Sequence, residues 1–198
     1  MPDDCESIEF WNQRYRDQKM AWDYGGVPPD LTNFLAEQPG SNASVLIPGC
    51  GSGYEIAAFR NAGYKVKAIE ISPEAIVRAR STIGETASRC IEQGDFFEMN
   101  LPRGSVQIVY ERTFHCALHP RRRPDYLQSM ANWIEPGGYL LGFFLYGSES
   151  EPPPYPMDPS LRETAFLPYF SLKNSRLSQR PIPMHQNMEY WQVWQRKG

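Results

Sequence analysis

The sequence lacks the features that define several large classes of protein. Its four cysteines, Cys5, Cys50, Cys90 and Cys116, are widely spread and contain no C-x-x-C pair. We therefore expect reduced thiols in a cytoplasmic protein and no disulfide framework. The most apolar stretch, 138–146, is far too short to cross a bilayer. The acidic N-terminus has no apolar run, so we expect neither a signal peptide nor a membrane partner.

Basic charge is also scarce. Lysine and arginine number 20 against 23 aspartates and glutamates, which gives a formal net charge of −3, whereas general nucleic-acid binders are usually basic. We therefore expect a small-molecule substrate and no nucleic-acid partner. The histidines and cysteines have no familiar metal-ligand spacing, so no metal site is expected.

The length suits one compact domain. A chain of 198 residues has no room for the separate substrate domain of a dehydrogenase. Hydrophobic residues make up 41% and charged residues 22%, which is ordinary for a folded protein. We expect a monomer with a single domain over 1–198.

Short strand patterns alternate with helical ones along most of the chain. Helical patterns at 7–18 and 30–38 come first, and the alternation continues to about residue 146. It predicts an α/β fold, a Rossmann-like parallel sheet with helices on both faces. A helix near 160–167 and an antiparallel edge hairpin are expected to complete it. The expected strands are 44–47, 64–69, 90–92, 106–110, 139–146, 169–173 and 189–196, the expected core helices are 54–62, 73–82 and 124–134, and 136–138 is expected to be a turn.

A glycine-rich segment follows the first expected strand directly. Gly49, Gly51 and Gly53 let the backbone turn sharply and approach a ligand, and the next helix offers free N–H groups. The dinucleotide fingerprint is G-x-G-x-x-G, but Tyr54 stands at its sixth position. A side chain of that size argues against an NAD site.

Acidic residues stand at the ends of the next three strands. Glu70 can accept the hydrogens of ribose hydroxyls, as an acid does in dinucleotide-binding proteins. The Asp95-Phe96 pair can take the exocyclic amine of adenine and cover its face, and Glu111-Arg112 lies where a reacting group would sit. The series is typical of S-adenosylmethionine enzymes. A structural turn, a nucleotide-binding module without catalysis and a short NAD-dependent reductase are the alternatives.

The sequence resembles the thiopurine S-methyltransferase family, and most closely its branch of thiol, thiocyanate and halide methyltransferases. The resemblance covers about residues 9–197. The segments that carry it are Phe10-Trp11 with Tyr15, Ala21-Trp22-Asp23, Leu46 to Tyr54, Ala68 to Ser72, Gly94 to Phe97, Tyr110 to Leu118, Pro136 to Gly138 and Pro153-Pro154-Tyr155.

The resemblance implies a seven-stranded class I methyltransferase sheet, an N-terminal helical lid over 1–42, a core over 43–198, and S-adenosyl-L-methionine as methyl donor, with S-adenosyl-L-homocysteine as product. Aromatic lid residues would wall the donor. Gly49 would approach its methionine part, Glu70 its ribose, Asp95 and Phe96 its adenine, and Glu111 its amino end. The implied donor-binding residues are Trp11, Tyr15, Trp22, Gly49, Gly51, Glu70, Ile71, Asp95, Phe96 and Glu111.

The chemistry points to a small soft nucleophile: a thiol, a thiopurine-like thiol, thiocyanate or a halide. Methyl transfer from a sulfonium is an in-line displacement, which a water-poor pocket favours, and a thiol with a pKa near 8.5 supplies some thiolate unaided. Arg112 could attract an anionic acceptor, although the halide and thiocyanate branch often lacks this arginine. Tyr24, together with Trp11, Tyr15 and Trp22, could surround the sulfonium by cation–π contacts. O- or N-methylation of a small metabolite, with His115 or His119 as base, is the alternative.

Overall fold

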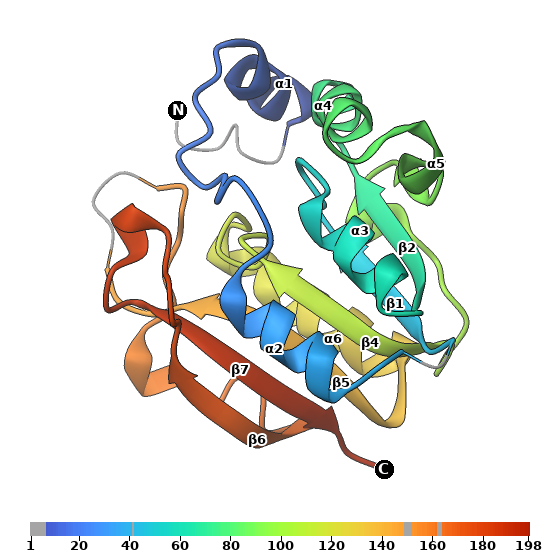
Figure 1. The fold of residues 1–198 in the computed structure, drawn as a ribbon. Coiled ribbons are helices and arrows are strands. Elements are labelled where there is room, and N and C mark those ends of the chain that lie inside the picture. Colours follow the sequence, from blue (N-terminus) through green and yellow to red (C-terminus); the bar gives the residue numbers. More distant parts are fainter. Residues whose placement is uncertain (1–6, 41, 149–151, 162–163) are drawn as a thin grey trace.

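The computed structural model describes residues 7–198 except 41, 149–151 and 162–163 (Figure 1). Its seven strands form one sheet in the order β3-β2-β1-β4-β5-β7-β6. The first five strands run parallel, and β7 pairs antiparallel with β5 and β6. The strands are β1 (Ser44–Pro48), β2 (Lys65–Glu70), β3 (Ile91–Gln93), β4 (Val106–Arg112), β5 (Ile134–Leu145), β6 (Phe170–Leu177) and β7 (Glu189–Arg196).

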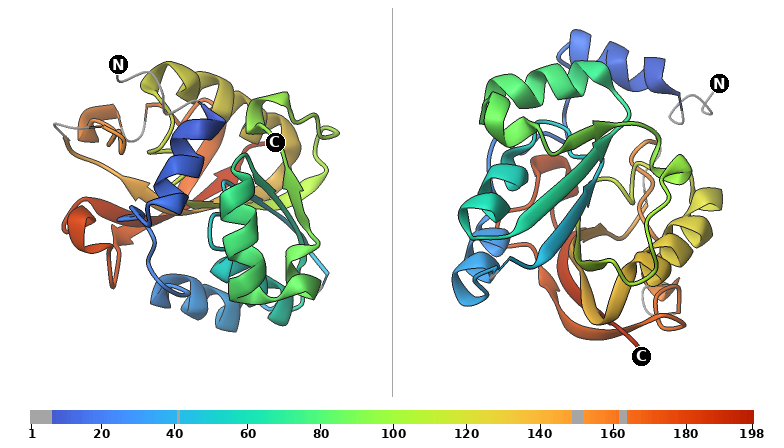
Figure 2. Two further views of the ribbon diagram at one scale, coloured as in Figure 1. Left: turned by 90° about the horizontal axis from the view of Figure 1, so that it is seen from above. Right: turned by 90° about the vertical axis from the view of Figure 1, so that its right-hand side faces the viewer.

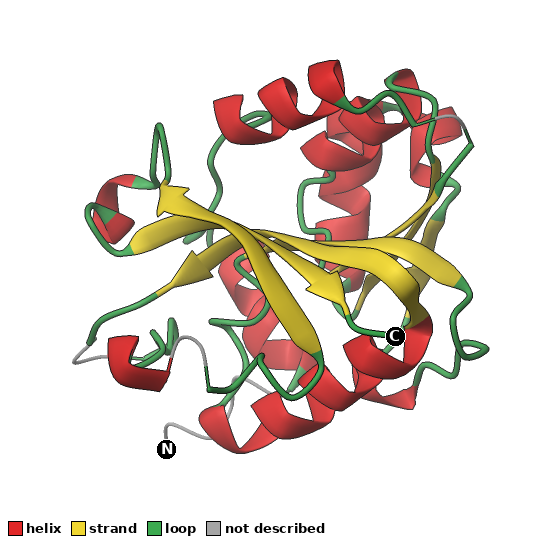
Figure 3. Cartoon of the chain, turned by 90° about the horizontal axis from the view of Figure 1, so that it is seen from below, coloured by secondary structure: helices red, strands yellow, loops and turns green. Residues whose placement is uncertain are grey.

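Helices cover both faces of this twisted sheet (Figure 3). The α-helices are α1 (Ile8–Arg16), α2 (Pro29–Glu37), α3 (Tyr54–Asn61), α4 (Pro73–Ile83), α5 (Glu85–Ser88) and α6 (Arg123–Trp133), and short 3-10 turns are η2 (Phe96–Glu98), η3 (Pro120–Arg122), η4 (Pro159–Leu161) and η5 (Pro183–His185). The predicted α/β class with seven strands is therefore confirmed.

Each face of the sheet has its own apolar core, because neighbouring residues of a strand point to opposite faces. Leu46 and Val109 pack with Tyr126 and Met130 of α6 on one face. Ile47 and Tyr110 belong to the core on the other face, where α2 and α3 lie. Strands buried on both faces explain the nearly continuous apolar runs of the sequence.

Two local predictions were wrong. The segment 136–138 is not a turn but lies inside β5, where the pairing with β4 shifts between Val106↔Ile134 and Ile108↔Tyr139. Gly137 has φ +85°, which lets the strand bulge without breaking the sheet. The helix expected near 160–167 is also absent from its described residues, which form η4 and turns; residues 162–163 lie outside the described part.

The N-terminal segment lies across the carboxyl ends of the parallel strands. Figure 1 shows α1 beside α4 and above the strand ends, and Figure 2 shows the same arrangement from two further sides. Ser7 caps α1 by accepting a hydrogen bond from the N–H of Phe10 at 3.1 Å. The residues between α1 and α2 return the chain to the sheet. We call residues 8–28 the roof, because they cover the edge where open parallel sheets bind ligands.

Candidate functional site

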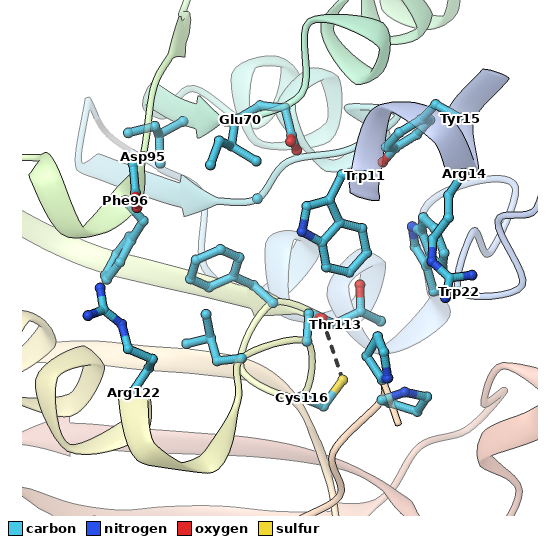
Figure 4. A pocket seen from close by; sticks show the side chains of 18 of the residues that line it. Trp11, Arg14, Tyr15, Trp22, Glu70, Asp95, Phe96, Thr113, Cys116 and Arg122 are labelled. Atoms are coloured by element: carbon cyan, nitrogen blue, oxygen red, sulfur yellow. Dashed lines mark hydrogen bonds between the residues drawn. The ribbon is translucent and has the colours of Figure 1, made fainter. Parts of the chain in front are cut away.

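A cavity of about 480 Å³ lies between this roof and the strand ends, which is a usual size for a small-molecule site. We call it the large cavity. Figure 4 shows Trp11, Tyr15 and Trp22 entering it from the N-terminal segment, with Glu70 and Asp95 on another wall. Its lining residues include Trp11, Arg14, Tyr15, Lys19, Trp22, Gly49, Glu70, Ile71, Asp95, Phe96, Phe97, Thr113, Phe114, Cys116, Arg122, Pro153, Pro154, Met184 and His185.

The glycine segment turns in a way that other residues rarely adopt. Gly49, Gly51 and Gly53 have φ values of +56°, +52° and +77°, all in the left-handed region that favours glycine. A Cβ atom on Gly49 would lie 2.4 Å from the ring of Phe114. The glycines therefore serve both the sharp turn and the close approach of two walls of the cavity.

Glu70 ends β2 and is held by backbone groups. Its Oε2 accepts the N–H of Gly51 at 3.0 Å, and its Oε1 accepts the N–H of Ser72 at 2.9 Å. Burial raises the pKa of Glu70, while these two hydrogen bonds oppose the rise. A carboxylate has about four acceptor sites, so Glu70 can still accept hydrogens from a hydroxylated ligand in the cavity.

Asp95 and Phe96 both reach the large cavity at the end of β3. The Oδ1 atom of Asp95 accepts the N–H of Phe97 at 2.8 Å, which fixes the turn η2. Phe96 is buried, with ring centroids 5.2 Å from both Phe114 and Trp133. The predicted pair is thus assembled beside Gly49, with Phe96 anchored in the core and Phe97 more exposed.

The aromatic roof is tied to the core at two points. Asn12 of α1 accepts a hydrogen bond from the Ser72 hydroxyl at 2.6 Å. Asp23 accepts one from the Ser52 hydroxyl at 2.6 Å and pairs with Arg78 at 3.1 Å. These contacts bind the roof to the glycine segment and to α4.

Within the roof, the rings contact one another edge to face. The ring centroid of Trp22 lies 5.5 Å from that of Trp11 and 5.9 Å from that of Tyr15. Burial, together with the charge of Glu70, raises the pKa of the Tyr15 hydroxyl, so Tyr15 is a neutral wall residue at ordinary pH.

Glu111 does not line the large cavity, contrary to the prediction that it faces the amino end of the donor. It is fully buried and accepts the N–H groups of Phe114 and His115, both at 2.8 Å, and the hydroxyl of Tyr126 at 2.8 Å. Burial raises its pKa to about 7. Glu111 instead shapes the loop after β4, which begins with Thr113 at φ +59°.

His115 also lies outside the cavity walls, so its predicted role as base does not fit its place in the fold. The loop turns its imidazole into the core, 5.4 Å from the ring of Tyr126 and 6.0 Å from those of Phe144 and Phe166. Burial lowers the pKa of His115 to about 3. His119 lines neither cavity and accepts the N–H of Arg121 at 3.3 Å.

Arg112 and Tyr24 line a second hollow of about 50 Å³, the small cavity, together with Gly51. Trp22, Gly49 and Thr113 line both cavities, so the two cavities adjoin. The guanidinium carbon of Arg112 lies 4.1 Å from the ring centre of Phe143 and 5.2 Å from that of Tyr24. Neither predicted catalytic residue reaches the large cavity directly.

Sequence reasoning missed several residues of the large cavity, among them His185, Met184 and Arg14. The one available signal was the i, i+4 spacing of His185 and Glu189, whose side chains meet with Nδ1 and Oε1 3.5 Å apart. Among the described residues, no group of three potential metal ligands comes together. No described helix combines the length and apolar character needed to cross a membrane.

Comparisons with known proteins extend this picture. A family model described as thiopurine S-methyltransferase (TPMT) matches residues 6–197. An Arabidopsis thaliana protein named "Probable thiol methyltransferase 2" is 28% identical over 162 residues, which are 80% of this chain and 71% of that protein. Another from Arabidopsis thaliana, thiocyanate methyltransferase 1, is 24% identical over 192 residues, which are 94% of this chain and 84% of that protein.

A solved methyltransferase shares the fold. The crystal structure of Burkholderia thailandensis 1,6-didemethyltoxoflavin-N1-methyltransferase, with bound 1,6-didemethyltoxoflavin and S-adenosylhomocysteine, superposes with a TM-score of 0.75. The two sequences are 16% identical, and the match covers 96% of this chain and 87% of the other. At that identity the likeness concerns the fold alone.

Proposed function

Because the chain belongs to the thiopurine S-methyltransferase family and is an S-adenosyl-L-methionine-dependent methyltransferase, we propose that its methyl acceptor is a small soft nucleophile. The candidates are a thiol, a thiopurine-like thiol, thiocyanate or a halide. The named thiol and thiocyanate methyltransferases among its relatives favour this acceptor class.

The observation that carries the proposal is the uneven distribution of acidic side chains around the large cavity. Among the described residues that line it, the carboxylates are Glu70 and Asp95, at the ends of β2 and β3. The described lining from the β4 loop, from residues 153–154 and from η5 includes Cys116, Pro153, Met184 and His185 and has no carboxylate. A polarizable sulfur or halide fits such walls better than a strongly hydrated oxygen or amine does.

The donor also fits the residues present. We propose that Glu70 holds the ribose, that Asp95 and Phe96 hold the adenine, and that Trp11 and Trp22 flank the sulfonium. When bound, the donor supplies an activated methyl group. The chain supplies position, which can contribute roughly 7–11 kcal/mol for well-oriented partners, and excludes water from the cavity under its aromatic roof.

Cationic side chains at the cavity favour anionic acceptors. Arg14, Lys19 and Arg122 all line it. Positive charge around a cleft raises the local concentration of anions and speeds their entry. The Cys116 thiol in the same wall stays protonated, because burial raises its pKa to about 12, so it does not compete with the acceptor.

The test is methylation of an acceptor panel with a deuteromethyl-labelled donor. We expect labelled methyl thioethers from thiols, and labelled methyl thiocyanate and methyl iodide from the two anions, all detected by mass spectrometry. Glu70→Ala should abolish every product, which ties the activity to this site. Label only in phenols, carboxylates or amines would overturn the proposal in favour of O- or N-methylation.

A further inference from the structure

A network of three charged or polar side chains, one partly buried and two buried, leads from the small cavity to the large one. Arg112 ends β4, Glu189 begins β7, and His185 ends η5. The Nη1 atom of Arg112 lies 3.5 Å from Oε2 of Glu189, and Oε1 of Glu189 lies 3.5 Å from Nδ1 of His185. Glu189 is 2% exposed and His185 3%.

The far end of this network is the imidazole of His185, in the wall of the large cavity. Pro153, Pro154 and Cys116 line the same cavity. Within the described part of the protein, Nε2 of His185 is buried and has no hydrogen-bond partner. Buried side-chain nitrogens nearly always have a partner, since leaving one unpaired is costly. An unpaired one in a cavity wall points to a ligand that completes it.

The charges of Arg112 and Glu189 decide which nitrogen of the His185 imidazole carries the hydrogen. The Arg112 guanidinium forms an ion pair with the carboxylate of Glu189. A carboxylate beside Nδ1 favours hydrogen on that nitrogen, so the lone pair lies on Nε2.

We propose that His185 Nε2 accepts the proton of a thiol acceptor, with Glu189 and Arg112 as positioning residues. This inference rests on the proposed function. In the step, the S–H proton moves to Nε2 and the sulfur lone pair forms the new bond to the methyl carbon. The bond between that carbon and the donor sulfur breaks, and its electron pair stays on the donor sulfur. The products are a methyl thioether, S-adenosyl-L-homocysteine and a proton, which His185 releases to solvent.

The proposal separates two kinds of acceptor. Thiocyanate and halides carry no proton, so they do not need His185. A thiol with a pKa near 8.5 is only about 3% thiolate at pH 7, and without a base only that fraction reacts. The thiol and anion activities should therefore respond differently to loss of the imidazole.

The first test replaces His185 with alanine. At pH 7 we expect kcat/KM for an ordinary thiol to fall by about 30-fold, in line with the thiolate fraction, while turnover of thiocyanate or iodide changes by less than about 3-fold. Added imidazole should restore the thiol activity, because it can enter the space left by the side chain. His119→Ala, at a histidine outside both cavities, is the matched control and should change neither activity.

The second test reads the imidazole directly, without turnover. The chain has three histidines, so ring ¹⁵N–¹H spectra of the full-length protein give three sets of signals. We expect His185 in the tautomer with hydrogen on Nδ1, and a population shift toward the other tautomer in Glu189→Gln. The same variant should lower thiol turnover more than thiocyanate turnover.

Three results would overturn the inference: hydrogen on Nε2 in the unaltered protein, equal losses for thiols and anions in His185→Ala, or no rescue by imidazole. Each leaves the proposed function intact as long as the unaltered protein methylates soft acceptors. Failure of the unaltered protein on every soft acceptor refutes the proposed function instead. If His185→Ala does not fold, Glu189→Gln and the tautomer measurement still decide.

Discussion

At the residue scale, Glu111 makes stability depend on pH. Its folded pKa of about 7 lies above its ordinary value of 4.5, so the folded state binds more protons than the unfolded state between these values. The free energy of unfolding should therefore fall as pH rises through this window, by about 3 kcal/mol. Glu111→Gln keeps the shape of the side chain and removes its charge. The free energy of unfolding of this variant, minus that of the unaltered protein, should therefore increase as pH rises over the same range.

Urea unfolding of both chains at pH 4.5, 6 and 8 measures this difference. Burial lowers the pKa of His115 to about 3, so His115 makes the free energy of unfolding rise with pH below pH 6.5. This contribution is the same in both proteins and disappears from their difference. Glu98→Gln, at an exposed acid of η2, should show no such trend. A pH-independent difference between Glu111→Gln and the unaltered chain would refute the assignment.

The same residues show how far single positions could be predicted. The sequence indicates that the strand ends carry Glu70, Asp95 and Glu111, but not which way each side chain turns. Glu70 and Asp95 face the cavity, whereas Glu111 turns inward because three hydrogen-bond donors of its own loop and α6 surround it. For His185 the sequence offered only its i, i+4 spacing to Glu189, which does not show that η5 reaches the cavity.

At the element scale, the glycine segment is the part least tolerant of side chains. Gly49→Ala adds a Cβ in a left-handed backbone conformation, 2.4 Å from the ring of Phe114. Gly25→Ala is the matched control, because Gly25 has φ +78° but nothing within 4 Å of its Cβ position. The stability of the control should fall only by the cost of the left-handed backbone conformation, about 1–2 kcal/mol.

Gly49→Ala should lose more stability than this and should also bind S-adenosyl-L-homocysteine more weakly, because the ring of Phe114 must move within the cavity wall. Denaturant unfolding and titration calorimetry measure the two effects. Equal losses of stability in both variants, with unchanged affinity in Gly49→Ala, would show that the approach of Phe114 is not important.

The contacts that hold the roof to the glycine segment and to α4 can also be tested. Asp23→Asn removes the charge that pairs with Arg78 and weakens the bond from Ser52. Hydrogen bonds to charged groups contribute about 1.5–3 kcal/mol, so amide exchange over residues 8–28 should speed up by about 10-fold or more. Asp17→Asn, at an exposed residue just after α1, is the control and should leave exchange near Trp22 unchanged.

Element boundaries were largely predictable, and the exceptions have physical reasons. Ser72 and Pro73 mark the start of α4 as expected, because capping and proline chemistry are local. The bulge in β5 was read as a turn, since Gly137 favours both and only pairing with β4 distinguishes them. The 160–167 segment has helical spacing, but its described residues form turns that pack Phe166 into the core.

At the scale of the whole molecule, the sheet order follows from the alternation only in part. Parallel strands β1 to β5 were expected, but the position of β7 between β5 and β6 depends on long-range pairing such as Phe143↔Trp191. The single domain, the monomeric state and the cytoplasmic location stay predictions.

Ligand binding should stabilise the whole molecule, because the large cavity, where we propose that the donor binds, is lined by the N-terminal roof and by residues that follow four strands. A ligand at 100 times its Kd stabilises the folded state by about 2.7 kcal/mol, which for a chain of this size raises Tm by roughly 5–10 °C. We expect this rise with S-adenosyl-L-methionine and S-adenosyl-L-homocysteine, and no rise with NAD or NADP. Glu70→Ala should abolish the rise, while the exposed substitution Glu98→Gln should retain it. An equal rise with NAD would contradict the assignment of the glycine segment, because Tyr54 stands where a dinucleotide site needs glycine.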